Sequence, residues 1–385
     1  MTMRIFTLDP RDTLFFGDGR SITVGPAHGH LVPAPSVLAG AIRTWQGLDE
    51  SGRWRGDPAD AKRIRVQGPF PVILGEQGEI ADWLFPAPAD ALEMEDDQPP
   101  REREGAPADR TINRLVPLAL NIADRVDLAS GSVVGMPTPD PRKPYRDTRP
   151  WWRWSSELRA WLAAPSMSLH VDGERGWGVP APLLEPRTHV SIHPDTGTAI
   201  QNALFTVNAR RWVVRLPRER LVHLGIAVRT EANVLPSQGA LGGEHRVVGV
   251  RPFDGEFPAC PAEVLESVKA GAVRLLLATP AIFEDGSRPG PGLALPAGSE
   301  VVAFAHQRAQ VVSGWDYAKR CPKPTRRMVP AGAVMFIRLG GSTADREAWA
   351  EKTWGEPISD EAQDRVDGFG TALLGAWDGR AHPLS

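Results

Sequence analysis

Short strand-like runs dominate this 385-residue chain. Residues 3–8, 64–67, 70–75 and 221–229 each combine β-branched and apolar residues over a few positions, and turn residues follow several of them. Runs of this kind predict β-strands. Long repeats of helical type are absent from the sequence. The chain is therefore expected to form sheets of short strands with few helices.

A smaller number of segments predict helices. In residues 33–48, Ser36 is a natural N-cap and apolar residues recur at helical spacing. Residues 155–164 begin with two serines and predict a second capped helix. Polar helices are expected near the C-terminus, at 343–353 and 359–366. Strands with helices between them indicate an α+β protein.

Length and composition divide the chain further. A chain of 385 residues suggests two or three domains, and residues 252–263 have the character of an interdomain connection. We predict domains at 1–258 and 259–385, with an insertion around 86–160 in the first. Residues 86–114 are rich in charge and proline. We interpret them as a solvated, mobile loop.

Residues 187–207 give a clearer local signal. Val190 and Ile192 alternate with polar residues, the turn sequence Pro-Asp-Thr-Gly occupies 194–197, and a second strand-like run ends near Phe205. Alternating runs on both sides of a turn predict a β-hairpin.

Charge and cysteine content limit the classes of function. The formal net charge is −3, so a binding site for a polyanion must be local. Two cysteines cannot form a disulfide framework or a zinc site. The N-terminus has no apolar stretch of signal-peptide length, and no run approaches the ~20 apolar residues of a membrane span. We expect a cytoplasmic protein.

Three segments gather positive charge beside aromatic residues: 142–153, 210–220 and 314–332. Cationic side chains bind phosphates, and aromatic rings stack on unpaired bases. One such cluster is usually a solvated surface, but three together favour RNA binding. From these clusters, the candidate RNA-binding residues are Lys143, Arg146, Arg149, Lys319, Arg320, Lys323, Arg326 and Arg327.

The glycine-rich segment 368–375 does not match a nucleotide-binding loop. Its third glycine position is Leu373, and no Gly-Lys-Ser/Thr follows. Gly368 and Gly370 permit a close backbone approach, either to RNA or to an adjacent strand. The histidines show no ligand cluster and no convincing acid–base pair. We therefore expect no metal, no cofactor and no catalytic residue.

Several of these segments occur in the order found in a known family. They are 9–21 (DPRDTLFFGDGRS), 33–43 (PAPSVLAGAIR), 187–205, 241–246 (LGGEHR), 313–332 and 368–375. Together they span nearly the whole chain. The set resembles the RAMP-type CRISPR subunits, and above all the third subunit of the Cmr (type III-B) effector complex.

The resemblance implies two ferredoxin-like (RRM-like) RAMP domains and a thumb-like β-hairpin. It also implies a non-catalytic subunit that holds the 5′ tag of the guide RNA. Such a subunit contacts the polymerase-like large subunit and the first backbone subunit, and meets target RNA only indirectly. The residues that match the family pattern are Arg20, Arg43, Arg246, Lys319, Lys323, Gly368 and Gly370.

Two other functions remain open. A metal-independent RAMP endoribonuclease that processes guide-RNA precursor would need a His and a Lys or Tyr at the scissile phosphate. A structural adaptor would bind protein alone.

Overall fold

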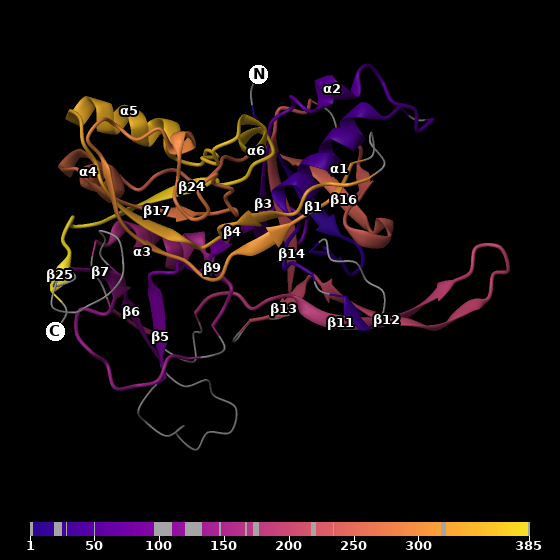
Figure 1. The fold of residues 1–385 in the computed structure, drawn as a ribbon, viewed down its shortest axis with the longest axis horizontal. Helices are drawn as coiled ribbons and strands as arrows, with labels where there is room; N and C mark the ends of the chain where they lie inside the picture. The colour runs from indigo at the N-terminus through magenta and orange to yellow at the C-terminus, as the bar shows by residue number, and fades with distance from the viewer. Residues whose placement is uncertain are drawn as a thin grey trace.

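Antiparallel strands make up most of the regular structure, and helices flank them (Figure 1). The protein has a mixed α/β, strand-rich fold. The computed structural model describes residues 3–18, 25–27, 29–49, 51–95, 110–119, 133–145, 148–165, 168–171, 177–216, 221–233, 235–316 and 321–383.

The larger sheet contains strands from the first 253 residues. Its strand order is β15 (Gln238–Ala240), β16 (Val247–Phe253), β1 (Arg4–Pro10), β14 (Leu221–Thr230), β3 (Val66–Leu74), β4 (Ile80–Pro86) and β9 (Trp151–Arg153). An eighth strand, β13 (Val213–Arg215), pairs with β14. The strands predicted at 3–8 and 221–229 are confirmed, and the runs at 64–67 and 70–75 form one strand, β3.

Helix α1 (Pro35–Gly47) packs on β3 of this sheet. Its buried face includes Leu38 and Ile42, as the helical spacing predicts. The predicted Ser36 cap is wrong. Ala34 is the N-cap without a side-chain bond, and Pro35 occupies the first turn. Proline suits that position because its missing N–H has no intrahelical partner there.

The second sheet contains strands from the C-terminal part of the chain. Its order is β18 (Glu300–Ala305), β23 (Val334–Arg338), β17 (Ala272–Leu277) and β24 (Ala372–Ala376). Helices α4 (Ala262–Ala270) and α5 (Thr343–Thr353) pack against each other and against β24. The helix predicted at 343–353 is confirmed, and Ser342 and Asp345 form a capping box at its start. The last predicted helix is α6 (Ala362–Val366).

The two sheets share a strand order. In chain order, β1, β3, β14 and β16 lie in space as 4-1-3-2, and β17, β18, β23 and β24 do the same. All the pairs within each set are antiparallel. The two halves of the chain therefore use the same arrangement of strands.

Strands also form within the predicted insertion. One small sheet contains β10 (Leu169–Val171), β6 (Arg110–Arg114) and β5 (Ala91–Met94), and another contains β25 (His382–Pro383), β7 (Val116–Ala119) and β8 (Val133–Gly135). The interpretation of 86–114 as a solvated loop is wrong for its described part. Met94 and Ile112 are buried, and the charged residues beside them are paired. Residues 96–109 lie outside the described residues.

A buried charge cluster joins this insertion to the second sheet. The Asp90 carboxylate accepts hydrogen bonds from Arg114 Nη1 (3.3 Å), from Trp161 Nε1 (3.1 Å) and from Arg274 Nη1. Arg114 and Arg274 also donate to the carbonyl of Trp161 at 2.8 and 2.9 Å. The three charged side chains are at most 2% exposed. Two guanidinium groups and one carboxylate are therefore buried in this cluster.

The helix predicted at 155–164 begins with a π-helical turn, Trp154–Leu158, and continues as α3 (Arg159–Ala163). The predicted serine cap is wrong. Ser155 donates its backbone N–H (3.2 Å) and its hydroxyl (2.5 Å) to the carboxylate of Asp82 on β4. The serine therefore fastens the helix to the sheet instead of capping it.

The predicted β-hairpin is confirmed. Strands β11 (Leu183–Ile192) and β12 (Ala199–Arg211) pair antiparallel, and the hairpin extends away from the body of the molecule (Figure 1). β2 (Gly25–Ala27) pairs in parallel with β12. The remaining short elements are α2 (Pro58–Ala61), the 3-10 turns Gly243–His245 and Pro291–Leu293, and strands β19 (Gln310–Val312), β20 (Trp315–Asp316), β21 (Cys321–Pro322) and β22 (Arg326–Met328).

The main hydrophobic core crosses the predicted boundary at residue 258. Phe70 and Phe85 from the first sheet share one cluster with Phe336 and Leu374 from the second. A separate cluster, which includes Leu38 and Ile226, lies under α1. The division into domains at 258 stays a prediction, and the two sheets share a continuous core.

Candidate nucleic-acid interface

Three of the segments singled out in the sequence meet in space. Val312 of β19 and Met328 of β22 are buried together with Ala34, Ile282 and Phe369. Ala34 precedes α1, Met328 is the last residue of β22 in the basic segment, and Phe369 belongs to the glycine-rich segment. This small apolar cluster therefore places the start of α1, residues 321–328 and the glycines side by side.

The basic segment presents two exposed cations at this place. Lys323 and Arg327 are exposed, and Lys323 N donates to the carbonyl of Gly314 at 2.8 Å. Lys319 and Arg320 lie outside the described residues. The side chains of Lys323 and Arg327 are therefore accessible from solvent, and their contact with RNA stays a prediction.

Arg326 has a different environment. Its guanidinium donates to both carboxylate oxygens of Asp364, at 2.8 and 2.6 Å, and lies 3.2 Å from Glu361. The hydrogen bonds that Arg326 donates to Asp364 raise the pKa of Arg326. A bidentate pair of this kind fastens β22 to α6. A role for Arg326 in RNA binding stays a prediction.

Gly368 and Gly370 approach other parts of this chain closely. Both have left-handed backbone conformations, with φ of 91° and 83°. A Cβ on Gly368 would lie 2.6 Å from the Val66 carbonyl oxygen of β3, and one on Gly370 would lie 3.1 Å from Ser359 N. Gly368 therefore shows the second of the two expected uses, contact with an adjacent strand, whereas Gly370 approaches Ser359, which lies outside the strands. Contact with RNA stays a prediction.

Arg43 joins the two halves of the chain. Its guanidinium lies 2.6 Å from Asp367, and it donates to the Ile64 carbonyl at 3.2 and 2.9 Å. The residue is 8% exposed. Arg43 therefore forms a largely buried ion pair with Asp367, the residue before the glycine-rich segment. Its contact with RNA stays a prediction.

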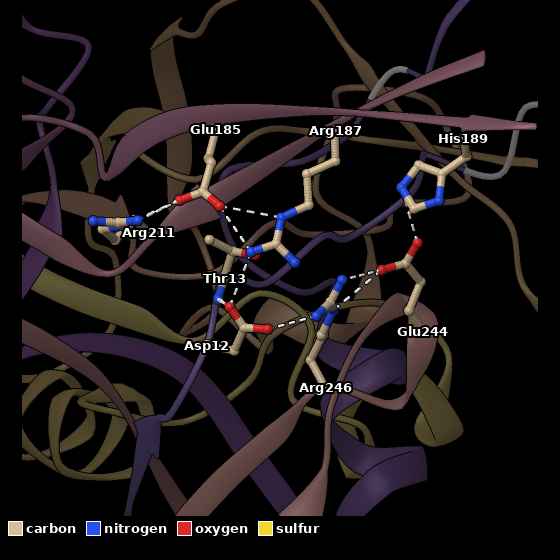
Figure 2. Close-up of polar contacts among 8 residues, drawn as sticks. All are labelled: Asp12, Thr13, Glu185, Arg187, His189, Arg211, Glu244 and Arg246. Carbon is tan, nitrogen blue, oxygen red and sulfur yellow. Dashed lines mark hydrogen bonds and ion pairs between the residues drawn. The ribbon is translucent and has the colours of Figure 1, made fainter. Parts of the chain in front are cut away.

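Arg246 belongs to a charged network at the base of the hairpin (Figure 2). Its Nη1 donates to Asp12 Oδ2 at 2.5 Å, and its Nε donates to Glu244 Oε2 at 3.1 Å. The pKa of the Asp12 carboxyl is lowered, first by the backbone N–H of Thr13 and then by Arg187. The role of Arg246 toward RNA also stays a prediction.

The other two basic clusters differ from expectation in their aromatic residues. Trp151, Trp152 and Trp212 are at most 4% exposed, and Trp151 stacks on Trp212. The expectation that these rings stack on bases is wrong, because they are packed into the protein core. Lys143 is exposed and Arg149 is half-buried, whereas Arg146 and Arg20 lie outside the described residues.

Two of the described histidines, His30 and His189, contact other parts of the protein. His30 Nε2 lies 3.1 Å from the Val311 carbonyl oxygen, and burial lowers the pKa of His30. His189 stacks on Phe205. Within the described residues, no group of three His, Cys, Asp or Glu side chains is placed to hold a metal ion.

Sequence reasoning missed the acidic partners of these arginines. Asp12 and Glu244 pair with Arg246, and Asp364 pairs with Arg326. The sequence contains one signal of a charged face near Arg246. Glu185 and Arg187 alternate in β11, and alternate residues of a strand share a face.

Comparison with known families identifies the chain. The family model described as CRISPR-associated protein (Cas_Cmr3) matches residues 6–377. The chain belongs to the Cas_Cmr3 family. The resemblance drawn from the sequence is thereby confirmed. A comparison with curated proteins gave no match.

Solved structures similar to this Cas_Cmr3 chain include chains from cryo-EM structures of Type III-B Cmr-beta bound to cognate target RNA, one of them also with AMPPnP. The identity is 12% in both, with 86% of each chain covered and TM-scores of 0.43 and 0.42. The assignment to the family rests on the family match.

Proposed function

We propose that this chain is a non-catalytic guide-RNA-binding subunit of a type III-B CRISPR effector complex. In this role it holds the 5′ tag of the guide RNA. It bridges the polymerase-like large subunit to the first backbone subunit, and it meets target RNA only through the assembled complex. The observation that carries the proposal is the match to the Cas_Cmr3 family over residues 6–377.

The strand order supports the finer part of the proposed fold. The order 4-1-3-2 in an antiparallel sheet is that of a ferredoxin-like unit, and both sheets have it. In the first sheet α1 connects β1 to β3, as in such a unit. In the second sheet α5 lies between the third and fourth strands. We propose two ferredoxin-like RAMP units with the β11–β12 hairpin as a thumb.

The proposed RNA face contains the start of α1, residues 321–328 and the glycine-rich segment. Pro322 and Pro324 keep the basic segment from closing into a helix. Its cations can therefore follow an extended sugar–phosphate chain.

Among the described residues, none of the helices combines the length and apolar character that crossing a bilayer requires.

Reversing the exposed cations is expected to weaken guide-RNA binding. In the variant Lys323→Glu with Arg327→Glu, affinity should fall most at low salt. Affinity falls as salt rises, and each lost phosphate contact should make the slope of log affinity against log salt less negative by about 0.7. Lys319→Glu added to Lys323→Glu should act in the same direction. Affinity for guide RNA, measured by fluorescence anisotropy over a range of salt, checks this result.

Lys352→Glu is the matched control for this experiment, because Lys352 is exposed on α5, outside the proposed RNA face. It should leave the salt slope unchanged. If the double variant keeps the wild-type slope but loses the large subunit in a pull-down, residues 323–327 form a protein interface instead.

The isolated protein is expected not to cleave RNA, with or without added metal. His30 is engaged by Val311, His189 is engaged by Phe205 and Glu244, and no metal cluster lies among the described residues. Incubation with labelled repeat RNA, analysed on denaturing gels, checks this result. Repeat-specific cleavage that is lost in His28→Ala or His189→Ala would favour the processing endoribonuclease.

A further inference from the structure

Charged side chains alternate in sign where the β11–β12 hairpin meets the body of the protein (Figure 2). The network comprises, in order of contact, Arg211, Glu185, Arg187, Asp12, Arg246 and Glu244, and the His189 ring, which is charged only when protonated, lies beside Glu244. Glu185, Arg187 and His189 are alternate residues of β11, and they lie on its inner face, the face toward the body of the protein. The loop after β1 and the turn before β16 supply the side chains of the body.

Two contacts in this network cross from hairpin to body. Arg187 Nη2 donates to Asp12 Oδ1 at 3.1 Å, and His189 Nε2 lies 3.2 Å from Glu244 Oε1. Arg246 contacts both Asp12 and Glu244 from the body side. The two crossing contacts are therefore linked through one guanidinium.

Backbone hydrogen bonds hold the hairpin nearer its base. Leu14 N donates to the Arg210 carbonyl at 2.9 Å, and Arg210 N donates to the Leu14 carbonyl at 2.8 Å. Farther along the hairpin, apolar side chains are exposed, including Val190, Ile192 and Leu204. The inner face of β11 is thus charged, and its outer face is apolar.

On the other strand of the hairpin, β2 pairs with residues 205–207 of β12, and Val207 and Ala209 are buried with Ala27. These contacts hold β12 to the body. The ion pairs are what holds the inner face of β11 against rotation away from Asp12 and Glu244.

We propose that the network is an ionic latch that fixes the angle of β11, with β12, which Leu14 and β2 hold to the body, as its pivot. Partly exposed ion pairs are individually weak, and salt screens them. The latch can therefore open without unfolding of either strand. This inference goes beyond the proposed function and does not depend on RNA, so the free protein tests it.

The test measures the distance from the hairpin turn to the body by double electron–electron resonance. Spin labels are attached at Asp195→Cys, in the exposed turn, and at Glu351→Cys, on α5. The exposed Cys321 is replaced by Ser. Cys260 is retained, because burial raises its pKa to about 12 and keeps its thiol unreactive.

Arg187→Gln is expected to lower the ratio of latched to released hairpins about fivefold. It should appear as a second, broader distance population. Asp12→Asn should have an effect at least as large, because Asp12 contacts both Arg187 and Arg246. Arg211→Gln is the matched control. Arg211 also pairs with Glu185, but that contact stays within the hairpin.

A second arm uses the labelled protein without latch substitutions. Raising the salt from about 0.1 M to about 1 M shortens the screening length from about 10 Å to about 3 Å and should release the hairpin. An unchanged distribution in Arg187→Gln, in Asp12→Asn or at high salt would overturn the proposal. An equal response to Arg211→Gln would also overturn it, since that contact does not reach the body.

Discussion

Asp90→Asn is expected to cost about 3–5 kcal/mol of the free energy of unfolding, the typical cost of removing one partner from a buried ion pair. The asparagine amide cannot neutralise Arg114 and Arg274, whose side chains are 2% exposed. Two guanidinium groups would then remain buried without a counter-charge. Since natural domains are stable by only about 5–15 kcal/mol, much of the variant should be unfolded at moderate denaturant. Urea unfolding followed by circular dichroism measures the change.

Asp60→Asn provides the control for this substitution. Asp60 also pairs with an arginine, Arg63, but its side chain is 70% exposed. Exposed pairs contribute at most about 1 kcal/mol, so the midpoint of this variant should hardly move. A loss in Asp90→Asn no greater than in Asp60→Asn would show that the buried cluster contributes little to stability.

Gly368→Ala is expected to cost about 2–5 kcal/mol, from left-handed strain and from overpacking together. Its φ of 91° disfavours any side chain, and the new Cβ would lie 2.6 Å from the Val66 carbonyl and 3.0 Å from Gln67 Cα. Both neighbours are backbone atoms, so β3 or the glycine-rich segment must move. Gly370→Val is expected to act similarly against Ser359, and to impair retention of guide RNA in the complex. Thermal unfolding and co-purified RNA measure these effects.

Gly298→Ala separates strain from close approach. Gly298 has a φ of 79°, and nothing lies within 4 Å of the position of a Cβ. This control should lose only about 1–2 kcal/mol, the cost of the left-handed conformation. Equal losses in Gly298→Ala and Gly368→Ala would mean that the contact with β3 has no energetic importance.

Local patterns predicted the local elements well. The β11–β12 hairpin follows from the alternation of Val190 and Ile192 and from the turn at 194–197. Helix α5 was expected as a polar helix at 343–353, and the structure adds a capping box of Ser342 and Asp345 at its start. Turns, strand alternation and helix starts depend on residues that are close in the sequence, so they can be predicted from the sequence alone.

The failures concern partners that are distant in the sequence. Asp90 belongs to a segment interpreted as solvated, but Arg274 meets it from another sheet. The pairing of Arg43 with Asp367 was also missed, and its role toward RNA stays a prediction. The sequence does not show whether an arginine will pair with a carboxylate or face solvent. Three of the segments chosen from the sequence meet in space, but the partners of the individual arginines could not be predicted.

The last strands of the chain complete structures that begin much earlier. β24 contributes Leu373 and Leu374 to the core shared with Phe70 and Phe85, and β25 pairs His382 with Leu118 of β7. During synthesis, part of the apolar surface of β3 and β4 stays exposed until these later residues emerge from the ribosome. Such long-range closure slows folding and exposes the nascent chain to aggregation. The demand for chaperones should therefore depend on how soon β24 and β25 are synthesised after β3 and β4.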